Sequence, residues 1–273
     1  SATDVLHLID LYYVQQKFID EAHLEKIIDL ECKVEPIVCK MEIEGITLDA
    51  DYWRELTAGV EVKAIELEKQ LKESLINSVD VSKYENAFQF SQAVAIPVKT
   101  KKLTRELESI IDPNVVKGWV VNNFNLHSHK QLLTILNLIG IKTPDTNEKT
   151  LNKLPSDSNL DLILEYRDYE KRLSTYGYNV IGAINPVTGK IHTDFNQVGT
   201  ASGRFSSSGD INMQNIPVHN GYREGFISRP NYSFLACDYS QQEYRLAGAI
   251  SKEPKIIEAY VNGFDMHTAT AAL

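Results

Sequence analysis

One stretch, residues 52–75, restricts the fold more than any other part of the sequence, because apolar side chains recur along it every three or four residues. The apolar side consists of Trp53, Leu56, Val60, Leu67 and Leu71. Opposite charges four residues apart, such as Glu68 and Lys72, line the other side and support a helix. A helix of this length needs another element packed along it, and the chain of 273 residues, 43% of them hydrophobic, can supply one. We therefore expect this helix to be a scaffold rather than a site.

Other helices are predicted throughout the first part of the chain. Their expected ranges are two helices within residues 1–31, then 34–44, 131–139 and 160–176. Gly45 and Gly140 end two of these runs. Pro97 and Pro113 interrupt the weaker pattern of residues 76–124, so shorter helices are expected there.

The pattern changes after the turn at residues 185–189, NPVTG. Residues 190–197 alternate like a strand, whereas residues 200–217 are rich in Ser, Gly, Asn and Asp without a helical period. An apolar strand is predicted at residues 232–237. Helices are predicted to follow it at about 241–250 and 255–261. This change of pattern indicates a change of domain.

The net charge of −9 counts against nucleic-acid binding, which usually needs a basic surface. The charge is uneven, however, and a local basic face can bind phosphate on an acidic protein. One cluster is Lys99, Lys101, Lys102 and Arg105, which alone is interpreted as a solvated surface. The cations that lie near polar residues suited to phosphate contact are Lys171, Arg172, Arg204 and Arg223.

Cysteine usage and hydropathy narrow the class further. Cys32, Cys39 and Cys237 lack paired CxxC spacing, so neither a disulfide framework nor a zinc site is predicted. No apolar run approaches the roughly 18 residues of a membrane span, and the first residues lack the basic region of a secretory signal. The expectation is a soluble, cytoplasmic protein without a membrane partner.

The sharpest candidate for chemistry is FLACDYSQQEYR, residues 234–245. An apolar strand here delivers Asp238 to its carboxyl end as a helix begins, where Mg²⁺ can be shared with phosphate oxygens. Alternatively, Ser240 and Glu243 match a capping box that only satisfies helix-start amides. Asp265 can cap a later helix with His267 in its first turn, which is either a phosphate contact or a surface histidine.

Four segments occur in the order and approximate spacing of one protein family. The run DYSQQEYR resembles motif A of family-A DNA polymerases, and TASGRFSSSGDINMQNIP resembles their T-x-x-GR-x-SS…N-x-QNIP segment. DMHTATA and VEPIVCKMEIEGITLD are similar to two further segments of that family. The resemblance runs from about residue 31 to the end and is weakest across residues 76–124. It implies an α+β fold with a mostly helical thumb, followed by a partial palm with a short antiparallel sheet.

The resemblance implies roles for motif A in a DNA-directed DNA polymerase. Asp238 corresponds to the first metal-binding aspartate, and the carbonyl of Tyr239 would be a further ligand in a two-Mg²⁺ site. Glu243, counted with Asp238 as catalytic, resembles the steric gate that rejects ribonucleotides by colliding with their 2′-hydroxyl. With Tyr239, the residues assigned to the incoming dNTP are Ser240, Gln241, Glu243 and His267.

The resemblance assigns other residues to primer-template DNA. Arg204 and Gln214 match positions that meet minor-groove acceptors near the primer terminus, where contacts check shape rather than sequence. Asn215 and Arg223 are assigned to positioning or phosphate contact, with a purely structural role left open.

Two segments resemble thumb elements of the family. EKRLSTY, residues 170–176, resembles K-x-x-STY, in which Lys171, Ser174 and Thr175 would grip the duplex backbone. Residues 125–132 resemble N-x-x-S-x-x-QL, although Ser128 and Gln131 can equally support their own helix.

The resemblance divides the chain into three expected parts. Residues 1–30 would be the end of a 3′–5′ exonuclease-like domain, with Asp4 as a metal ligand without its partners. Residues 31–180 would be the thumb and the start of the polymerase module, and residues 181–273 a partial palm with motif A and the start of the fingers. The fingers helix and the second catalytic carboxylate are expected outside this chain. We therefore expect a module inactive alone, either part of a longer reading frame or half of a split enzyme that needs a carboxy-terminal palm and fingers segment.

Two other functions are considered. One is binding of duplex DNA without chemistry, as the amino-terminal half of a split polymerase, and the other is that of a single-subunit RNA polymerase relative, against which Glu243 argues. The sequence departs from the family at His219, Gln242, Tyr244 and the short loop 220–224, which places local phosphate contacts and nucleotide packing in question. The strands predicted near residues 190–197 and 232–237 would have exposed edges, which predicts poor solubility or self-association of the chain. The family implies a bacterial cytoplasm or nucleoid, or a phage-infected cell.

Overall fold

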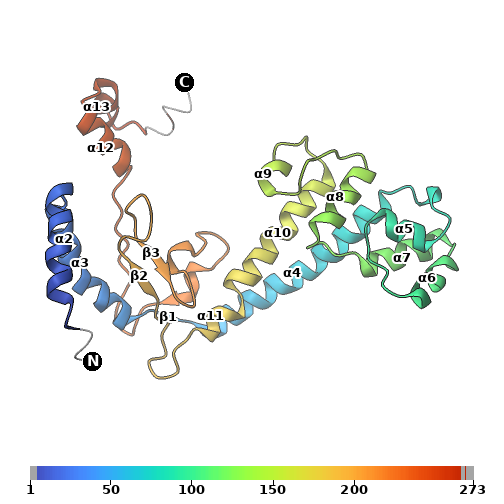
Figure 1. Cartoon of the computed structure of the whole chain (residues 1–273), viewed down its shortest axis with the longest axis horizontal. Helices are drawn as coiled ribbons and strands as arrows, with labels where there is room; N and C mark the ends of the chain where they lie inside the picture. The colour runs from blue at the N-terminus through green and yellow to red at the C-terminus, as the bar shows by residue number, and fades with distance from the viewer. Residues whose placement is uncertain (1–4, 266–267, 269–273) are drawn as a thin grey trace. The chain divides into compact units, whose positions relative to one another are not determined.

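The computed structural model describes residues 5–265 and residue 268, and it forms two compact units, residues 1–227 and residues 228–273. The predicted α+β class is confirmed, because helices dominate and accompany two small antiparallel sheets (Figure 1). The helices of the first unit are α2 (Leu8–Ala22), α3 (Glu25–Glu44), α4 (Ala50–Asn77), α5 (Ala87–Ala93), α6 (Lys101–Glu108), α7 (Pro113–Asn123), α8 (His129–Leu138), α9 (Glu148–Leu151), α10 (Ser158–Tyr176) and α11 (Tyr178–Gly182). Its 3-10 turns are η1 (Val81–Lys83), η2 (Met213–Asn215) and η3 (Arg223–Gly225).

The long helix predicted from the apolar pattern is α4, and α10 packs along it (Figure 1). Two hydrogen bonds show that the pair is antiparallel. Trp53 Nε1, near the start of α4, donates to the carbonyl of Tyr176 at the end of α10, at 3.1 Å. Ser74 Oγ, near the end of α4, donates to Asn159 Oδ1 near the start of α10, at 2.7 Å. The apolar side of α4 is therefore buried by the partner that its length required.

The weakly patterned region, residues 76–124, folds into η1 and helices α5, α6 and α7 around the far end of α4. A side-chain oxygen accepts a first-turn amide at the start of each of α5 to α8, and these caps are Asn86, Thr100, Asp112 and Ser128. Pro113 occupies the first turn of α7, where its missing amide costs no hydrogen bond. Phe90, Val120 and Ile135 lie fully buried in this core.

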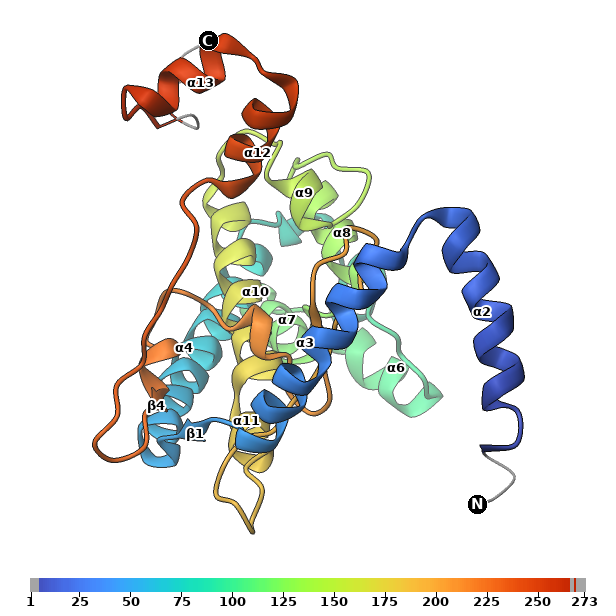
Figure 2. The same cartoon turned by 90° about the vertical axis from the view of Figure 1, so that its left-hand side faces the viewer.

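Two sheets of two strands complete the first unit. Strand β1 (Thr47–Leu48) pairs antiparallel with β4 (Phe226–Ile227), and β2 (Asp194–Asn196) pairs with β3 (Ser206–Ser208). Figure 2 shows β1 and β4 beside the start of α4, where the Asp49 amide donates to the Gly225 carbonyl at 2.8 Å. A second core packs here, and its buried members are Leu48, Trp53, Tyr176, Val180, Ile191, Ile211, Ile216 and Tyr222.

The amino-terminal helices differ from the prediction. Instead of ending before residue 34, the second helix continues as α3 through Pro36 to Glu44. It stops at Gly45, whose φ of +60° favours glycine, as predicted. Among the described residues, no side chain of α2 is buried. In the described ranges, 5–265 and 268, no helix is both long and apolar enough to cross a membrane.

The second unit contains α12 (Gln242–Ser251) and α13 (Pro254–Val261), close to their predicted ranges. The strand predicted at residues 232–237 is wrong, because these residues pair with no strand within the part of the chain that the structure describes. Phe234 is 60% exposed and Leu235 88% exposed. Apolar character alone does not form a strand, which needs a neighbour for its backbone amides and carbonyls.

Candidate nucleic-acid interface and motif A segment

The end of α10 presents the predicted phosphate-gripping residues on one face. Ser174 and Thr175 follow Lys171 by three and four residues, and all three side chains are exposed. Ser174 Oγ donates to the carbonyl of Lys171 at 3.2 Å. Over the described ranges, Lys171 takes part in no ion pair. Its ammonium charge therefore faces solvent beside two hydroxyl groups.

The neighbouring cation, Arg172, is engaged differently. Its guanidinium forms an ion pair with Asp168, one turn earlier, and lies 4.6 Å from the ring centroid of Tyr169. Its side chain is mostly buried, and its charge is already balanced. Lys171, rather than Arg172, is therefore the cation that this end of α10 presents to solvent.

A compact joint links α10 to the segment that carries Gln214 and Asn215. The Tyr176 hydroxyl donates to the carbonyl of Asn215, and Trp53 Nε1 donates to the carbonyls of Tyr176 and Gly177 at 3.1 and 3.2 Å. Burial raises the pKa of the Tyr176 hydroxyl, so it remains a donor at neutral pH. The structure thus brings the predicted thumb residues and the turn with Gln214 together within one unit.

Gln214 and Asn215 belong to the turn η2, and both are exposed. The Asn212 side chain starts this turn by accepting the Gln214 amide at 3.1 Å. Ser207 Oγ in turn donates to the same Asn212 oxygen at 2.9 Å. The backbone that carries Gln214 is held in place while its side chain meets solvent.

Arg204 and Arg223 are also exposed but lie in separate loops. Arg204 follows Gly203, which has a φ of +72°, and its carbonyl accepts from Thr200 Oγ1 at 2.9 Å. Arg223 opens the turn η3, directly after the buried Tyr222. No hydrogen bond or ion pair found among the described residues joins either arginine to Gln214. Their assignment to DNA remains a prediction.

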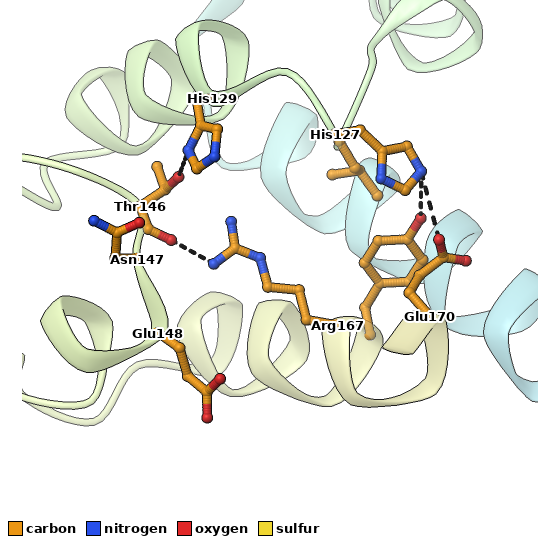
Figure 3. Close-up of a pocket in the computed structure, with 9 residues that line it drawn as sticks. His127, His129, Thr146, Asn147, Glu148, Arg167 and Glu170 are labelled. Atoms are coloured by element: carbon orange, nitrogen blue, oxygen red, sulfur yellow. Dashed lines mark hydrogen bonds and ion pairs between the residues drawn. The ribbon is translucent and has the colours of Figure 1, made fainter. Parts of the chain in front are cut away.

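A pocket in the helical part contains residues that sequence reasoning did not select (Figure 3). The hollow measures about 330 Å³, and its lining comes from α8, α9, α10 and the loops that precede α8 and α9. Arg167 donates to the carbonyl of Thr146, and His129 Nδ1 lies 2.6 Å from Thr146 Oγ1. On the other side, His127 Nε2 lies 3.4 Å from the Tyr166 hydroxyl and 3.6 Å from a Glu170 oxygen.

The electrostatics of this pocket centre on Arg167. Burial lowers the pKa of its guanidinium, and the nearby Glu148 opposes that shift. Arg167 forms no ion pair within the described part of the chain, so its charge is partly desolvated without a bonded carboxylate. It precedes Lys171 by four residues, so the two lie on the same side of α10. The sequence could have indicated Arg167, because in the run EYR before EKRLSTY this arginine falls at helical spacing from Lys171.

The motif A segment lies in the second unit. Asp238, Tyr239 and Ser240 are exposed, and α12 begins at Gln242 after Gln241, whose φ is +55°. The capping-box interpretation is therefore wrong, because Gln241 rather than Ser240 occupies the cap and no side chain caps the helix. The helix therefore begins one position later than the capping box requires.

Gln241 has structural partners in the second unit. Its Nε2 donates to Asp265 Oδ1 at 2.8 Å, and its Oε1 accepts from the Tyr260 hydroxyl at 2.8 Å. Arg245 Nε donates to the Ser240 carbonyl at 2.8 Å, and its guanidinium lies 4.3 Å from the Tyr260 ring centroid. These contacts fix the loop after Asp238 onto α12 and α13. His267, assigned to the nucleotide from the sequence, and Asp4 lie outside the described residues.

The donor set around Asp238 suits a hard cation. Within residues 5–265 and 268, no three His, Cys, Asp or Glu side chains gather as a metal cluster. The Asp238 carboxylate and the Tyr239 carbonyl are oxygen donors, and Mg²⁺ is commonly held by one or two carboxylates together with substrate phosphates and water. Asp238 and Tyr239 therefore supply oxygen donors of the kind that Mg²⁺ prefers, and their assignment as metal ligands remains a prediction.

A solved structure shares the fold. The POL domain of Pol1 from M. smegmatis, in complex with DNA primer-template and dNTP, matches 87% of this chain and 36% of its own length, with a TM-score of 0.60 and 23% sequence identity. The architecture of helical part and small sheets is therefore that of a polymerase domain.

Sequence comparisons define the family. The model of DNA polymerase family A matches residues 96–273. DNA polymerase I of Synechocystis sp. is 32% identical over 94% of this chain, and that of Caldicellulosiruptor bescii is 34% identical over 77%. The chain spans only 23% and 28% of these two relatives. The chain belongs to DNA polymerase family A, which confirms the resemblance seen in its motifs.

Proposed function

We propose that this chain supplies the thumb and the first catalytic carboxylate of a DNA-directed DNA polymerase, which transfers nucleotides from dNTPs to a primer 3′-hydroxyl. The observation that carries this proposal is the exposed face of α10. It presents Lys171, Ser174 and Thr175 next to the joint that holds the turn of Gln214 and Asn215. Membership of DNA polymerase family A supports it.

The face of α10 would bind the sugar-phosphate backbone of primer-template DNA. The Lys171 ammonium supplies a charge that attracts phosphate, and the Thr175 hydroxyl can donate to a phosphate oxygen. The Ser174 hydroxyl can do the same once it turns away from the Lys171 carbonyl. Arg167 extends the same side of the helix by one turn, and its guanidinium still has donors beyond the one used by Thr146. Such contacts are independent of sequence and weaken with salt. They would hold a duplex of any sequence in one register.

Gln214 and Arg204 would contact the minor groove near the primer terminus. Purine N3 and pyrimidine O2 atoms there accept hydrogen bonds in every correct base pair. A glutamine side chain held in a fixed position can therefore donate to a base pair of the correct shape and not to a distorted one. Asn215 and Arg223 would support this region or contact phosphate.

Asp238 and the Tyr239 carbonyl would hold Mg²⁺ with the triphosphate of the incoming nucleotide. When bound in a two-metal site, Mg²⁺ activates the primer hydroxyl and stabilises the leaving pyrophosphate. Ser240, Gln241 and His267 would lie along the nucleotide, and Glu243 would exclude its 2′-hydroxyl. A two-metal site needs further carboxylates, which we assign to a palm and fingers segment beyond this chain. The bacterial relatives favour a bacterial cytoplasm or a phage-infected cell as the setting.

Primer extension tests this proposal. The purified chain is given primed template, Mg²⁺ and four dNTPs, alone and with a carboxy-terminal palm and fingers half from a related DNA polymerase I. Extension only in the mixture, lost in Asp238→Ala but kept in Asp161→Ala, an exposed carboxylate on α10, is the expected result. No extension in either reaction, with duplex binding retained, would leave a DNA-binding protein without chemistry.

A further inference from the structure

Two elements far apart in the sequence, the end of α10 and the turn η2, are joined by one side chain. Tyr176 is 7% exposed, and its hydroxyl donates to the carbonyl of Asn215, the residue after Gln214. The Tyr176 ring lies 5.6 Å from the ring of Tyr222, which belongs to the same core. The hydroxyl is therefore the polar end of an otherwise apolar contact.

The α10 side of this joint is rigid. The helix ends at Tyr176, and the next residue is Gly177, where a Cβ atom would lie 2.3 Å from the carbonyl oxygen of Leu173. No other residue fits there without moving the backbone. Trp53, which is fully buried, donates to the carbonyls on both sides of this break. Lys171 therefore stands on a helix end that is anchored to the core.

The η2 side is held from two directions. Asn212 accepts the amide of Gln214 at its start, and the Tyr176 hydroxyl occupies the carbonyl at its end. Gln214 lies between these two anchors, and its own side chain is exposed. Removing one anchor frees the turn without changing any residue that faces DNA.

We propose that Tyr176 is a positioning residue that sets the distance between the phosphate-gripping face of α10 and the minor-groove residue Gln214. This inference rests on the proposed function, because it takes both elements to contact one duplex. The hydroxyl transmits the position of the helix end to the turn. The phosphate contacts of α10 and the base-pair contact of Gln214 are thereby held at a fixed distance from each other.

The two kinds of contact respond differently to a small displacement. Attraction between a lysine and a phosphate falls as the inverse of distance, so moving from 4 to 5 Å removes about a fifth of it. A hydrogen bond to a base acceptor needs about 2.7–3.2 Å, and a shift of about 1 Å abolishes it. Losing the Tyr176 hydroxyl should therefore impair base testing and spare phosphate binding.

The experiment measures equilibrium binding of the purified chain to primer-template duplexes by fluorescence anisotropy. Paired duplexes carry either a natural purine or its 3-deaza analogue, which lacks the minor-groove acceptor, near the primer terminus. The unchanged chain should bind the analogue about two- to tenfold more weakly, the effect of one hydrogen bond. Tyr176→Phe should bind both duplexes equally, with an unchanged salt dependence. Gln214→Ala should behave in the same way, and the double variant should be no weaker than either.

Tyr178→Phe is the matched control, since it removes the same hydroxyl two residues away, where its exposed side chain donates to Glu61 at 3.3 Å. It should discriminate like the unchanged chain. If Tyr176→Phe still distinguishes the natural duplex from its 3-deaza analogue, the inference is overturned while the proposed function stays intact. The same holds if binding by Tyr176→Phe depends less on salt, because that result indicates a general loss of the fold. The inference is also overturned if the unchanged chain binds the natural duplex and its analogue equally. If the unchanged chain binds neither duplex, the inference and the proposed function are both overturned.

Discussion

Replacing Trp53 with phenylalanine tests whether the joint at the end of α10 is as important to the fold as its contacts indicate. Trp53 is fully buried, and its ring meets Tyr222 and Phe226 edge-on at 5.4 and 5.5 Å. Its Nε1 donates to the carbonyls of Tyr176 and Gly177. The Gly177 carbonyl also accepts the Val180 amide at 3.2 Å. Phenylalanine would therefore leave chiefly the Tyr176 carbonyl without a donor.

The size of the effect follows from these contacts. Phenylalanine lacks two of the ring carbons of tryptophan, which at about 0.8 kcal/mol each costs about 1.6 kcal/mol of burial. A buried carbonyl without a donor costs about 1–3 kcal/mol more. The free energy of unfolding should thus fall by about 2.6–4.6 kcal/mol, and the melting temperature by about 5–18 °C for a unit of this size.

Thermal unfolding followed by calorimetry measures this change, with Trp119→Phe as the matched control. Trp119 lies on α7, is only partly buried, and its Nε1 makes no hydrogen bond over residues 5–265 and 268. The control should lower the melting temperature by a few degrees at most. If Trp53→Phe is no more destabilising than Trp119→Phe, the joint does not hold α10 as we infer.

Three further predictions follow from individual side chains. Thr57 has a buried hydroxyl without a hydrogen-bond partner among the residues that the structure describes, so Thr57→Val should raise the free energy of unfolding by about 1 kcal/mol in denaturant titrations; a decrease would show that the hydroxyl is satisfied. Burial raises the pKa of Tyr222 to about 12 from an ordinary value near 10, so its contribution to stability is complete below pH 10 and is lost as the pH rises towards 12. Tyr222→Phe should flatten this decline, and an equally steep decline would contradict the assignment. In a complete polymerase that carries this segment, Glu243→Ala should increase ribonucleotide incorporation, whereas unchanged sugar selectivity would remove Glu243 from the nucleotide site.

Local patterns predicted the helices well. The apolar periodicity of residues 52–75 and the Asp49 cap, which accepts the Tyr52 amide at 3.0 Å, together define α4. The periodicity of residues 160–176 likewise gives α10, which ends where the sequence places Gly177. Such signals depend on residues only a few positions apart, so they do not require contacts with the rest of the chain.

Features that depend on distant partners were not predictable in the same way. The apolar run at residues 232–237 suggested a strand, but a strand forms only where another one pairs with it. Trp53 and Tyr176 meet across 123 positions, and the pocket of Figure 3 joins three separate segments. No local pattern encodes these contacts. The family motifs nevertheless marked Lys171 and Gln214, whose connection only the structure reveals.

The exposed face of α10 is the feature on which the proposed function depends most directly, and the salt dependence of primer-template binding tests its role. Binding by the unchanged chain is compared with Lys171→Ala and with Lys117→Ala, a change to a lysine on α7. Losing one phosphate contact should reduce the slope of log K against log salt by about 0.9, and only Lys171→Ala should show this reduction. Equal slopes for the unchanged chain and Lys171→Ala would contradict the proposal that α10 grips the DNA backbone.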